Sequence, residues 1–401
     1  MTTSTASAHP TNLPLDGVRV VDFSRLLPGP WCTQALGDLG ADVIKVEQPD
    51  VGDYARYNPP TFKSVGVYFN SINRNKRSIT LDLTDAIDRD AAYALIDSAN
   101  IVVESFRDGV PQKLGIDYET LAKRNPLLIY CSITGFGNES KLGRVPGHDL
   151  SIQGVAGTLL KTVEPGQRPS MPTFQGGDFT AAAFATIGIL SAYIRRMNSK
   201  VGCYIEVPMF QSLVSASNVG MSGALARVAG YPGKPEMEPW GKNPRYNIYE
   251  TRDGKFVTAC LLEYRAWQRF CEYIGRSELA PSEGWADRHS THGERTGAIR
   301  EAIATFCLSR DRDALADEMR AAEIAICAIY TADEAIGSEH ARDTGVVDFT
   351  EPADEGRIPY VVDPLATAGL TDPGRLPAPA LGQHTDEILQ SIQRPRRDDR
   401  A

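Results

Sequence analysis

The sequence predicts an α/β protein with a doubly wound large domain and a smaller second domain. Short apolar, β-branched segments alternate with helical segments from residue 18 to residue 209. Strands that alternate with helices pair in parallel, because each helical crossover returns the chain to the same edge of the sheet. The chain has 401 residues, 42% of them hydrophobic, and this length allows two or three domains with separate cores.

The predicted elements of the large domain follow one another in a regular order. Residues 18–47 predict a strand, a helix and a strand: VRVVDF, then WCTQALGDLG after a PGP turn, then DVIKVE. Gly40 fits the position just after the helix, where a left-handed residue ends it. The further predicted strands cover residues 79–83, 101–105, 127–135 and 203–209, and the further helices begin near residue 84 or cover residues 118–123 and 179–196.

Composition divides the chain into four segments. Residues 1–14 predict a flexible leader, and residues 15–227 contain the alternation of strands and helices. A Gly- and Pro-rich stretch at 228–245 indicates a linker, and it opens a smaller α+β domain that runs to residue 335. Residues 336–401 are rich in proline and end in a charged tail.

Charge and cysteine content exclude several classes of protein. The 42 Lys and Arg residues, against 51 Asp and Glu, give a net charge of −9, and without a long basic run nucleic-acid binding is not predicted. The seven cysteines form no C-x-x-C pair, which indicates buried reduced thiols. The sequence shows neither a signal-peptide pattern nor an uninterrupted apolar stretch of about 18 residues, so it predicts a soluble, cytoplasmic protein.

Two basic segments are candidates for binding a phosphorylated ligand. The spacing G-x-G-x-x-G is absent after the first strand, so the sequence does not favour a dinucleotide cofactor. Lys76 and Arg77 belong to the segment NRNKR before the third predicted strand, and Arg107 follows the strand IVVES. Ligands bind outside the carboxyl ends of parallel strands, where Lys76 and Arg77 are expected to meet a phosphate, and Arg107 also follows a strand at such an end. A solvated polar loop and an ordinary surface arginine are the alternative interpretations.

One histidine and two carboxylates are candidates for chemistry. His148 precedes Asp149 in PGHDL, and Asp178 follows two glycines in GGDF at the start of an apolar helix. An aspartate there commonly caps the helix, but the glycines also allow a ligand to approach, and a helix N-terminus stabilises a developing oxyanion. Glu263, in CLLEYRAW, is interpreted most simply as an exposed capping residue.

Taken in order, these segments resemble the family III CoA-transferase superfamily along nearly the whole chain. The resemblance is carried by LDGVRVVDFSRLLPGPWCTQALGDLGADVIKVEQP, NRNKRSITLDL, ESFRDGVPQKLGIDYETL, NPLLIYCSITGFG, GHDLSIQGVAG, GGDF and LGQHTDEIL. The superfamily includes CoA-transferases that act on carboxylic acids and α-methylacyl-CoA racemases. The resemblance implies a Rossmann-like large domain completed by residues 336–401, a small domain from the middle of the chain, and an interlocked homodimer.

The resemblance also implies where the substrate binds. CoA is expected over the large domain, and each active site is expected between the large domain of one subunit and the small domain of its partner. The residues expected to bind the acyl-CoA are Arg25, Asn73, Asn75, Lys76, Arg77, Arg107, Gly147 and Gly177. CoA enters as part of the substrate, so no further cofactor, no metal, no nucleic acid and no membrane partner is expected.

Two chemistries follow from the resemblance, and both use Asp178. In the transferases the aspartate at this position attacks the acyl thioester and passes through an anhydride and an aspartyl-CoA thioester. In the racemases the same aspartate pairs with a histidine, matched here by His148 and supported by a glutamate matched by Glu263. That pair removes and returns the α-proton of a 2-methyl-branched acyl-CoA.

Some features of this sequence favour the racemase chemistry, and others favour the transferase chemistry. His148 stands where the transferases usually carry an aromatic or other non-basic residue, and Leu27 stands where they often carry glutamine; both favour the racemase. The chain length, the insertion at 57–72 and the residues around Glu263 favour the transferase. We expect acyl-CoA racemisation, with CoA transfer through Asp178 as the alternative. A non-catalytic CoA-binding dimer is a third interpretation, which Asp178 and His148 together disfavour.

Overall fold

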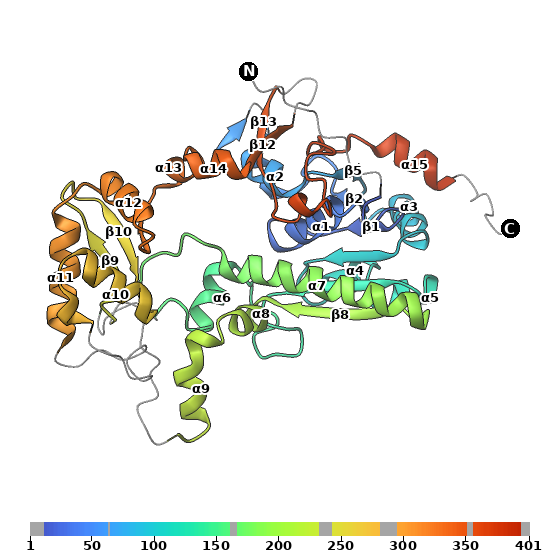
Figure 1. Ribbon diagram of the computed structural model, residues 1–401. Coiled ribbons are helices and arrows are strands. Elements are labelled where there is room, and N and C mark those ends of the chain that lie inside the picture. The colour runs from blue at the N-terminus through green and yellow to red at the C-terminus, as the bar shows by residue number, and fades with distance from the viewer. Residues whose placement is uncertain are drawn as a thin grey trace. The chain divides into compact units, whose positions relative to one another are not determined.

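The computed structural model describes residues 12–62, 65–160, 167–231, 243–280, 295–350 and 356–393. The chain divides into two compact units (Figure 1): unit 1 contains residues 1–216 and 340–401, and unit 2 contains residues 217–339. Parts of the predicted leader, linker and tail lie outside the described residues, namely residues 1–11, 232–242 and 394–401.

Unit 1 is built on a six-stranded parallel sheet, which confirms the predicted α/β architecture. Its strands are β1 (Arg19–Asp22), β2 (Asp42–Glu47), β5 (Lys76–Thr80), β6 (Ile101–Glu104), β7 (Ile129–Thr134) and β8 (Cys203–Pro208). They lie in the order β5-β2-β1-β6-β7-β8, and every neighbouring pair is parallel. Along the chain, β1, β2 and β5 extend the sheet in one direction, and β6, β7 and β8 extend it in the other. The strand order therefore reverses between β1 and β6.

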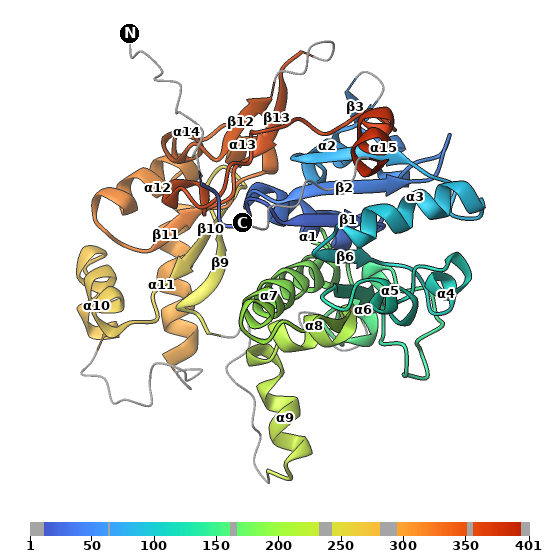
Figure 2. The same cartoon turned by 90° about the vertical axis from the view of Figure 1, so that its right-hand side faces the viewer.

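Helices cover both faces of this sheet. The helices of unit 1 include α1 (Pro28–Asp38), α2 (Val67–Ile72), α3 (Ala86–Asp97), α4 (Val110–Leu114), α5 (Tyr118–Arg124), α6 (Asp149–Val155), α7 (Gly176–Ser199), α8 (Met209–Ala216) and α15 (Thr385–Gln393). One layer contains α1, α6, α7 and α8, and the other contains α3, α5 and α15. Figures 1 and 2 both show α7 alongside α8. Because alternate strand residues face opposite layers, Val20 packs on one side and Val21 on the other.

The C-terminal segment returns to unit 1. β12 (Val347–Thr350) and β13 (Ile358–Val361) pair as an antiparallel ribbon, and α15 packs against α3 and β5. The His384 N–H donates to the Ser78 carbonyl of β5 at 2.9 Å. Residues 340–401 therefore belong to the same packed unit as the first 216 residues.

Unit 2 contains a three-stranded antiparallel sheet in the order β11-β10-β9. Trp267, Phe270 and Ile303 are among the buried residues of its separate core. Its elements include α9 (Ser222–Val228), β9 (Tyr246–Glu250), β10 (Phe256–Cys260), α10 (Tyr264–Tyr273), α11 (Thr296–Leu308), α12 (Arg312–Ala321), β11 (Ile326–Ala328) and α13 (Ala332–Ile336), and α14 (Glu339–Thr344) follows at its boundary.

The third strand of the sheet begins earlier than predicted. The sequence predicts a strand over residues 79–83, but β5 begins at Lys76. Lys76 and Arg77 carry charges, which are typical of loop residues, so the sequence placed the start of the strand after them. In the sheet, Lys76 pairs with Asp22 and Arg77 pairs with Asp42. Charged side chains are tolerated inside a protein when they are paired in this way.

The helix α7 is the one element in the described ranges that is long and apolar enough to cross a membrane, and 33% of its most apolar window is buried. It packs against α1 and α8, as a core helix does. Its other side carries the exposed apolar residues Phe184, Ile187, Ile194 and Met197. These four residues, spaced three, seven and three positions apart, form the α7 apolar face.

Candidate active site

The loops after β1 and β6 lie next to each other where the strand order reverses. In a doubly wound sheet, this place at the carboxyl ends of the strands is where ligands bind. The Phe23 N–H donates to the Val103 carbonyl at 2.8 Å, and the Arg25 N–H donates to Ser105 Oγ at 3.2 Å. These hydrogen bonds join the two loops into one edge of the candidate site.

Two arginines without carboxylate partners lie on these loops. The Arg25 guanidinium lies over the rings of Tyr54 and Phe106, 5.8 and 5.5 Å from their centroids. Arg107 is exposed. Among the described residues, neither guanidinium makes an ion pair or donates a hydrogen bond. The two rings hold the Arg25 guanidinium while its N–H donors stay available, which suits recognition of a phosphate.

Lys76 and Asn73, which the sequence predicts to bind CoA, point into the interior instead. Lys76 Nζ lies 3.1 Å from Asp22 Oδ2 and 2.8 Å from Asn73 Oδ1, and Lys76 and Asp22 are fully buried. The Asn73 amide donates to the Phe69 carbonyl at 3.1 Å. Burial lowers the pKa of Lys76 to about 8, against the opposing attraction of Asp22. A phosphate would have to displace Asp22 to reach this ammonium group.

Asn75 and Arg77 were predicted at the wrong end of the sheet. Residues that precede a parallel strand lie at its amino end, whereas ligands bind at the carboxyl end. The Asn75 amide donates to Asp38 Oδ1 at 2.6 Å, and Arg77 pairs at 2.7 Å with Asp42, the first residue of β2. Because they make these bonds, neither the Asn75 nor the Arg77 side chain lies at the loop that carries Arg25.

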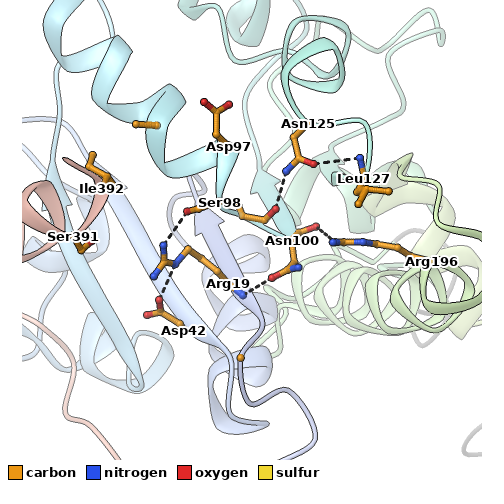
Figure 3. A pocket seen from close by; sticks show the side chains of 13 residues that line it. Arg19, Asp42, Asp97, Ser98, Asn100, Asn125, Leu127, Arg196, Ser391 and Ile392 are labelled. Carbon is orange, nitrogen blue, oxygen red and sulfur yellow. Dashed lines mark hydrogen bonds and ion pairs between the residues drawn. The ribbon is translucent and has the colours of Figure 1, made fainter. Parts of the chain in front are cut away.

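A cavity of about 930 Å³ also lies at the amino end of the sheet (Figure 3). Its basic groups are already bonded: Arg19 Nε donates to Asp42 Oδ2 at 2.9 Å, and Arg196 Nη1 donates to the Asn100 carbonyl at 3.1 Å. A smaller cavity of about 300 Å³ lies beside Arg107 at the carboxyl end. We place the candidate site at the carboxyl end, because Arg25 and Arg107 there make no ion pair with any described residue.

Asp178 is the third residue of α7, and a different aspartate caps the helix. Because α7 begins at Gly176, before the predicted residue 179, Asp178 is not the N-cap. The Asp149 carboxylate accepts the N–H groups of Gly177 at 2.7 Å and of Asp178 at 3.3 Å. The Asp178 carboxylate has no hydrogen-bond partner in the described part of the chain, so its oxygens are available to a substrate.

A glutamine fixes the capping carboxylate. Gln153 lies one turn after Asp149 on α6, and its amide donates to Asp149 Oδ2 at 2.7 Å and to the Phe174 carbonyl at 2.9 Å. Sequence reasoning missed the roles of Gln153 and Asp149. The signal was their spacing of four residues, which places both side chains on one face of a helix.

Two glycines let α6 approach its neighbours closely. A Cβ atom on Gly147 would lie 2.6 Å from the Cα atom of Gly135, which follows β7. A Cβ atom on Gly177 would lie 3.0 Å from Ile152 Cγ2 on α6. The glycines therefore bring α6 to the carboxyl end of the sheet and against the first turn of α7. Their predicted contact with the acyl-CoA stays a prediction.

Burial raises the pKa of Asp178 to about 7, with a further contribution from the charge of Asp149. The charge of Asp178 also acts on Tyr68 of α2. Burial raises its pKa most, and the charges of Asp178 and Asp53 raise it further. Tyr68 comes from the segment 57–72, which was noted only as an insertion, and its aromatic side chain was the available signal.

His148 and Glu263 belong to different units. His148 is the exposed N-cap residue of α6, and its side chain makes no capping hydrogen bond. Its chain neighbour Asp149 contacts α7, so His148 adjoins the helix junction that carries Asp178. Glu263 is the exposed N-cap residue of α10 in unit 2, also without a capping hydrogen bond from its side chain.

Sequence comparison places this chain among enzymes that act on CoA esters. The model of CoA-transferase family III matches residues 15–385. Succinyl-CoA:mesaconate CoA-transferase of Haloarcula hispanica is 33% identical, covering 94% of this chain and 95% of that protein. Succinate–glutarate CoA-transferase of Agrobacterium fabrum is 31% identical, covering 95% and 96%. Acetyl-CoA:oxalate CoA-transferase of Acetobacter aceti is 34% identical, covering 72% and 73%.

Structural comparison extends this similarity over both units. The crystal structure of a CAIB/BAIF family protein from Brucella suis matches with a TM-score of 0.80 and 29% sequence identity. The match covers 95% of this chain and 100% of that one. The six-stranded sheet and its helices are therefore shared with a solved structure.

Proposed function

The chain belongs to CoA-transferase family III, and we propose that it transfers CoA between an acyl-CoA and a carboxylic acid. Relatives that match along nearly the whole chain carry the names of CoA-transferases. The comparisons therefore do not support the expected racemisation. The alternative, transfer through Asp178, takes its place.

The proposed reaction passes through covalent intermediates on Asp178. Its carboxylate attacks the acyl carbonyl of the donor thioester, and CoA leaves as a thiolate while a mixed anhydride forms. The thiolate attacks the Asp178 carbonyl carbon, which releases the donor acid as a carboxylate and leaves an aspartyl-CoA thioester. The acceptor carboxylate attacks this thioester, and the CoA thiolate leaves again as a second anhydride forms. Attack of that thiolate on the acceptor carbonyl gives the new acyl-CoA and frees Asp178.

The observation that carries this proposal is the placement of the Asp178 carboxylate. It lies in the first turn of a long helix, without a hydrogen bond to any other described group, so its oxygens are not engaged elsewhere. A carboxylate with a raised pKa is also more basic, and therefore more nucleophilic once ionised, than one in water. The positive end of the α7 dipole favours the oxyanion that forms during each attack.

Arg25 and Arg107 are the proposed receptors for the CoA phosphates. Both follow strands at the point where the sheet order reverses, and both keep their donors available. Asn73, Lys76 and their neighbours are not retained in this role, because their side chains bond other groups of the chain.

The proposal includes a homodimer, and the α7 apolar face supports it. Ile187 and Ile194 are each 58% exposed, and Phe184 is 38% exposed. An exposed apolar patch of this kind commonly marks a protein interface. Burying such side chains contributes about 1.5–3 kcal/mol each when they are fully covered.

The test of transfer uses acids named for the relatives. The protein is incubated with succinyl-CoA and either mesaconate or glutarate, and the new CoA ester is quantified by mass spectrometry. We expect formation of the acceptor's CoA ester, together with an adduct on Asp178 that hydroxylamine converts to a hydroxamate. The Asp178→Asn variant serves as the control and should form neither. CoA binding without turnover on a broad panel of acids would support a non-catalytic protein instead.

A further inference from the structure

The loop that carries Arg25 is held in a strained conformation by one buried aspartate. Leu26 has a φ of 63°, in the left-handed region that side chains other than glycine rarely adopt. Its N–H points at the Asp53 carboxylate, 3.1 Å from Oδ1 and 3.2 Å from Oδ2. Such backbone strain persists only where surrounding bonds fix it, and Asp53 supplies these bonds.

A lysine holds the same loop on the other side of Arg25. Lys45 Nζ lies 3.0 Å from Asp53 Oδ2, and the two side chains are 1% and 0% exposed. The same ammonium group donates to the Ser24 carbonyl at 2.8 Å. The buried ion pair therefore bonds the backbone both before Arg25, at Ser24, and after it, at Leu26.

Asp53 also fixes a ring that flanks the guanidinium. It is the N-cap of the short 3₁₀ helix Tyr54–Tyr57, and its Oδ1 accepts the Ala55 N–H at 2.9 Å. Tyr54 at the start of this turn is one of the two rings beside Arg25. One carboxylate thus sets both the backbone of the arginine and one of the aromatic rings that hold its side chain.

We infer that Asp53, through its ion pair with Lys45, is a positioning residue for CoA binding and presents the Arg25 guanidinium to a CoA phosphate. The inference rests on the proposed function in taking CoA as the ligand. It goes beyond that function by assigning a task to a buried pair that touches no substrate.

The first experiment compares the wild type with Asp53→Asn. Asparagine keeps the size of the side chain but loses the charge that pairs with Lys45. We expect the KM for succinyl-CoA and the Kd for CoA to rise about tenfold, because the phosphate loses a preset charge-assisted contact. The value of kcat should stay within about twofold of the wild type, because Asp178 is untouched.

Two further measurements separate positioning from a general loss of structure. Succinyl-pantetheine lacks the phosphates, so the Asp53→Asn variant should process it as the wild type does. Arg25→Met should raise the KM for succinyl-CoA about tenfold as well, and the double variant should show no further rise, because both changes remove one interaction. Asp85→Asn, which alters an N-cap of α3 away from the site, is the matched control.

Folding and function are tested separately. If Asp53→Asn does not fold, the pair Asp53→Asn with Lys45→Met leaves no unpaired buried charge, and the same shift in CoA affinity is expected. Unchanged CoA affinity in a folded variant, equal losses with succinyl-pantetheine, or additive effects with Arg25→Met would overturn the inference. A wild type that binds CoA but transfers it to no acid would contradict the proposed function and leave the binding test valid.

Discussion

Asp149 Oδ1 accepts the backbone N–H of Gly177 at 2.7 Å, across the junction between α6 and α7. This bond caps the helix that carries the proposed nucleophile and also places a second carboxylate beside it. The cap fixes the backbone of Asp178, while the charge of Asp149 adds to the burial that raises the Asp178 pKa. One residue therefore influences both the position and the proton affinity of the reacting group.

The first prediction concerns the pH dependence of transfer. Only ionised Asp178 attacks a thioester, so kcat/KM should rise with pH through the pKa of about 7. Asp149→Asn removes the neighbouring charge, and the rise should move to lower pH. Asp117→Asn likewise removes the charge of a capping aspartate, that of α5, and should leave the pH profile in place. A profile unchanged by Asp149→Asn would show that Asp149 does not act on the reacting group.

The second prediction concerns stability. The pKa of Asp178 is about 7 when folded and near 3.8 when unfolded, so ionisation of this carboxylate destabilises the fold as pH rises above its unfolded value. Asp178→Asn should therefore unfold at a higher temperature than the wild type at pH 8, with the difference vanishing near pH 3.8 and below. Differential scanning calorimetry across pH measures this. A less stable variant at pH 8 would contradict the stated environment of Asp178.

The third prediction separates the two chemistries considered for the family. In the proposed transfer no proton leaves the α-carbon, and His148 is an exposed residue with no capping bond. His148→Ala should retain CoA transfer to within about tenfold of the wild type. In deuterated water, a 2-methylacyl-CoA should gain no deuterium at its α-carbon. Rapid deuterium exchange in the wild type that is lost in His148→Ala would instead support racemisation as the reaction of this protein.

The fourth prediction contrasts a buried lysine with an exposed arginine. Lys76→Met leaves Asp22 without one of its buried partners, which should cost about 3–5 kcal/mol of unfolding free energy. Arg107→Gln should leave the free energy of unfolding within about 0.5 kcal/mol and raise the KM for succinyl-CoA. Chemical denaturation and steady-state kinetics measure the two effects. A stable Lys76→Met protein with weak CoA binding would instead support the sequence-based prediction that Lys76 binds CoA.

The fifth prediction concerns assembly. A charge on the α7 apolar face should oppose the proposed homodimer, so Ile187→Asp should yield unfolded or aggregated protein in place of the dimer in sedimentation experiments. Ile87→Asp alters a residue that is 79% exposed on α3, outside this face, and should sediment as the wild type does. For the wild type we expect no natively folded monomer over a wide concentration range, as an interlocked dimer requires. A reversible monomer–dimer equilibrium would contradict interlocking.

The amino-acid sequence by itself determined the sheet and the place of Asp178 in the first turn of a helix, whereas the proposed role of Asp178 follows from the resemblance to the family. Apolar strands separated by helices require parallel pairing with helices on both faces, and the structure has that arrangement. The segment GGDF likewise places Asp178 at the start of a helix. Both results depend on local periodicity and on residues close together in the chain, which a sequence displays directly.

Only the tertiary structure decided which charges are available to a ligand. Lys76 and Arg25 both looked like phosphate receptors, but Lys76 meets Asp22, which lies 54 positions earlier in the chain, whereas Arg25 meets two aromatic rings. Asp149 caps α7 by accepting the N–H of Gly177, a residue that lies 28 positions later in the chain. Folding chooses such partners by proximity in space, because a buried charge must be paired wherever its partner lies in the sequence.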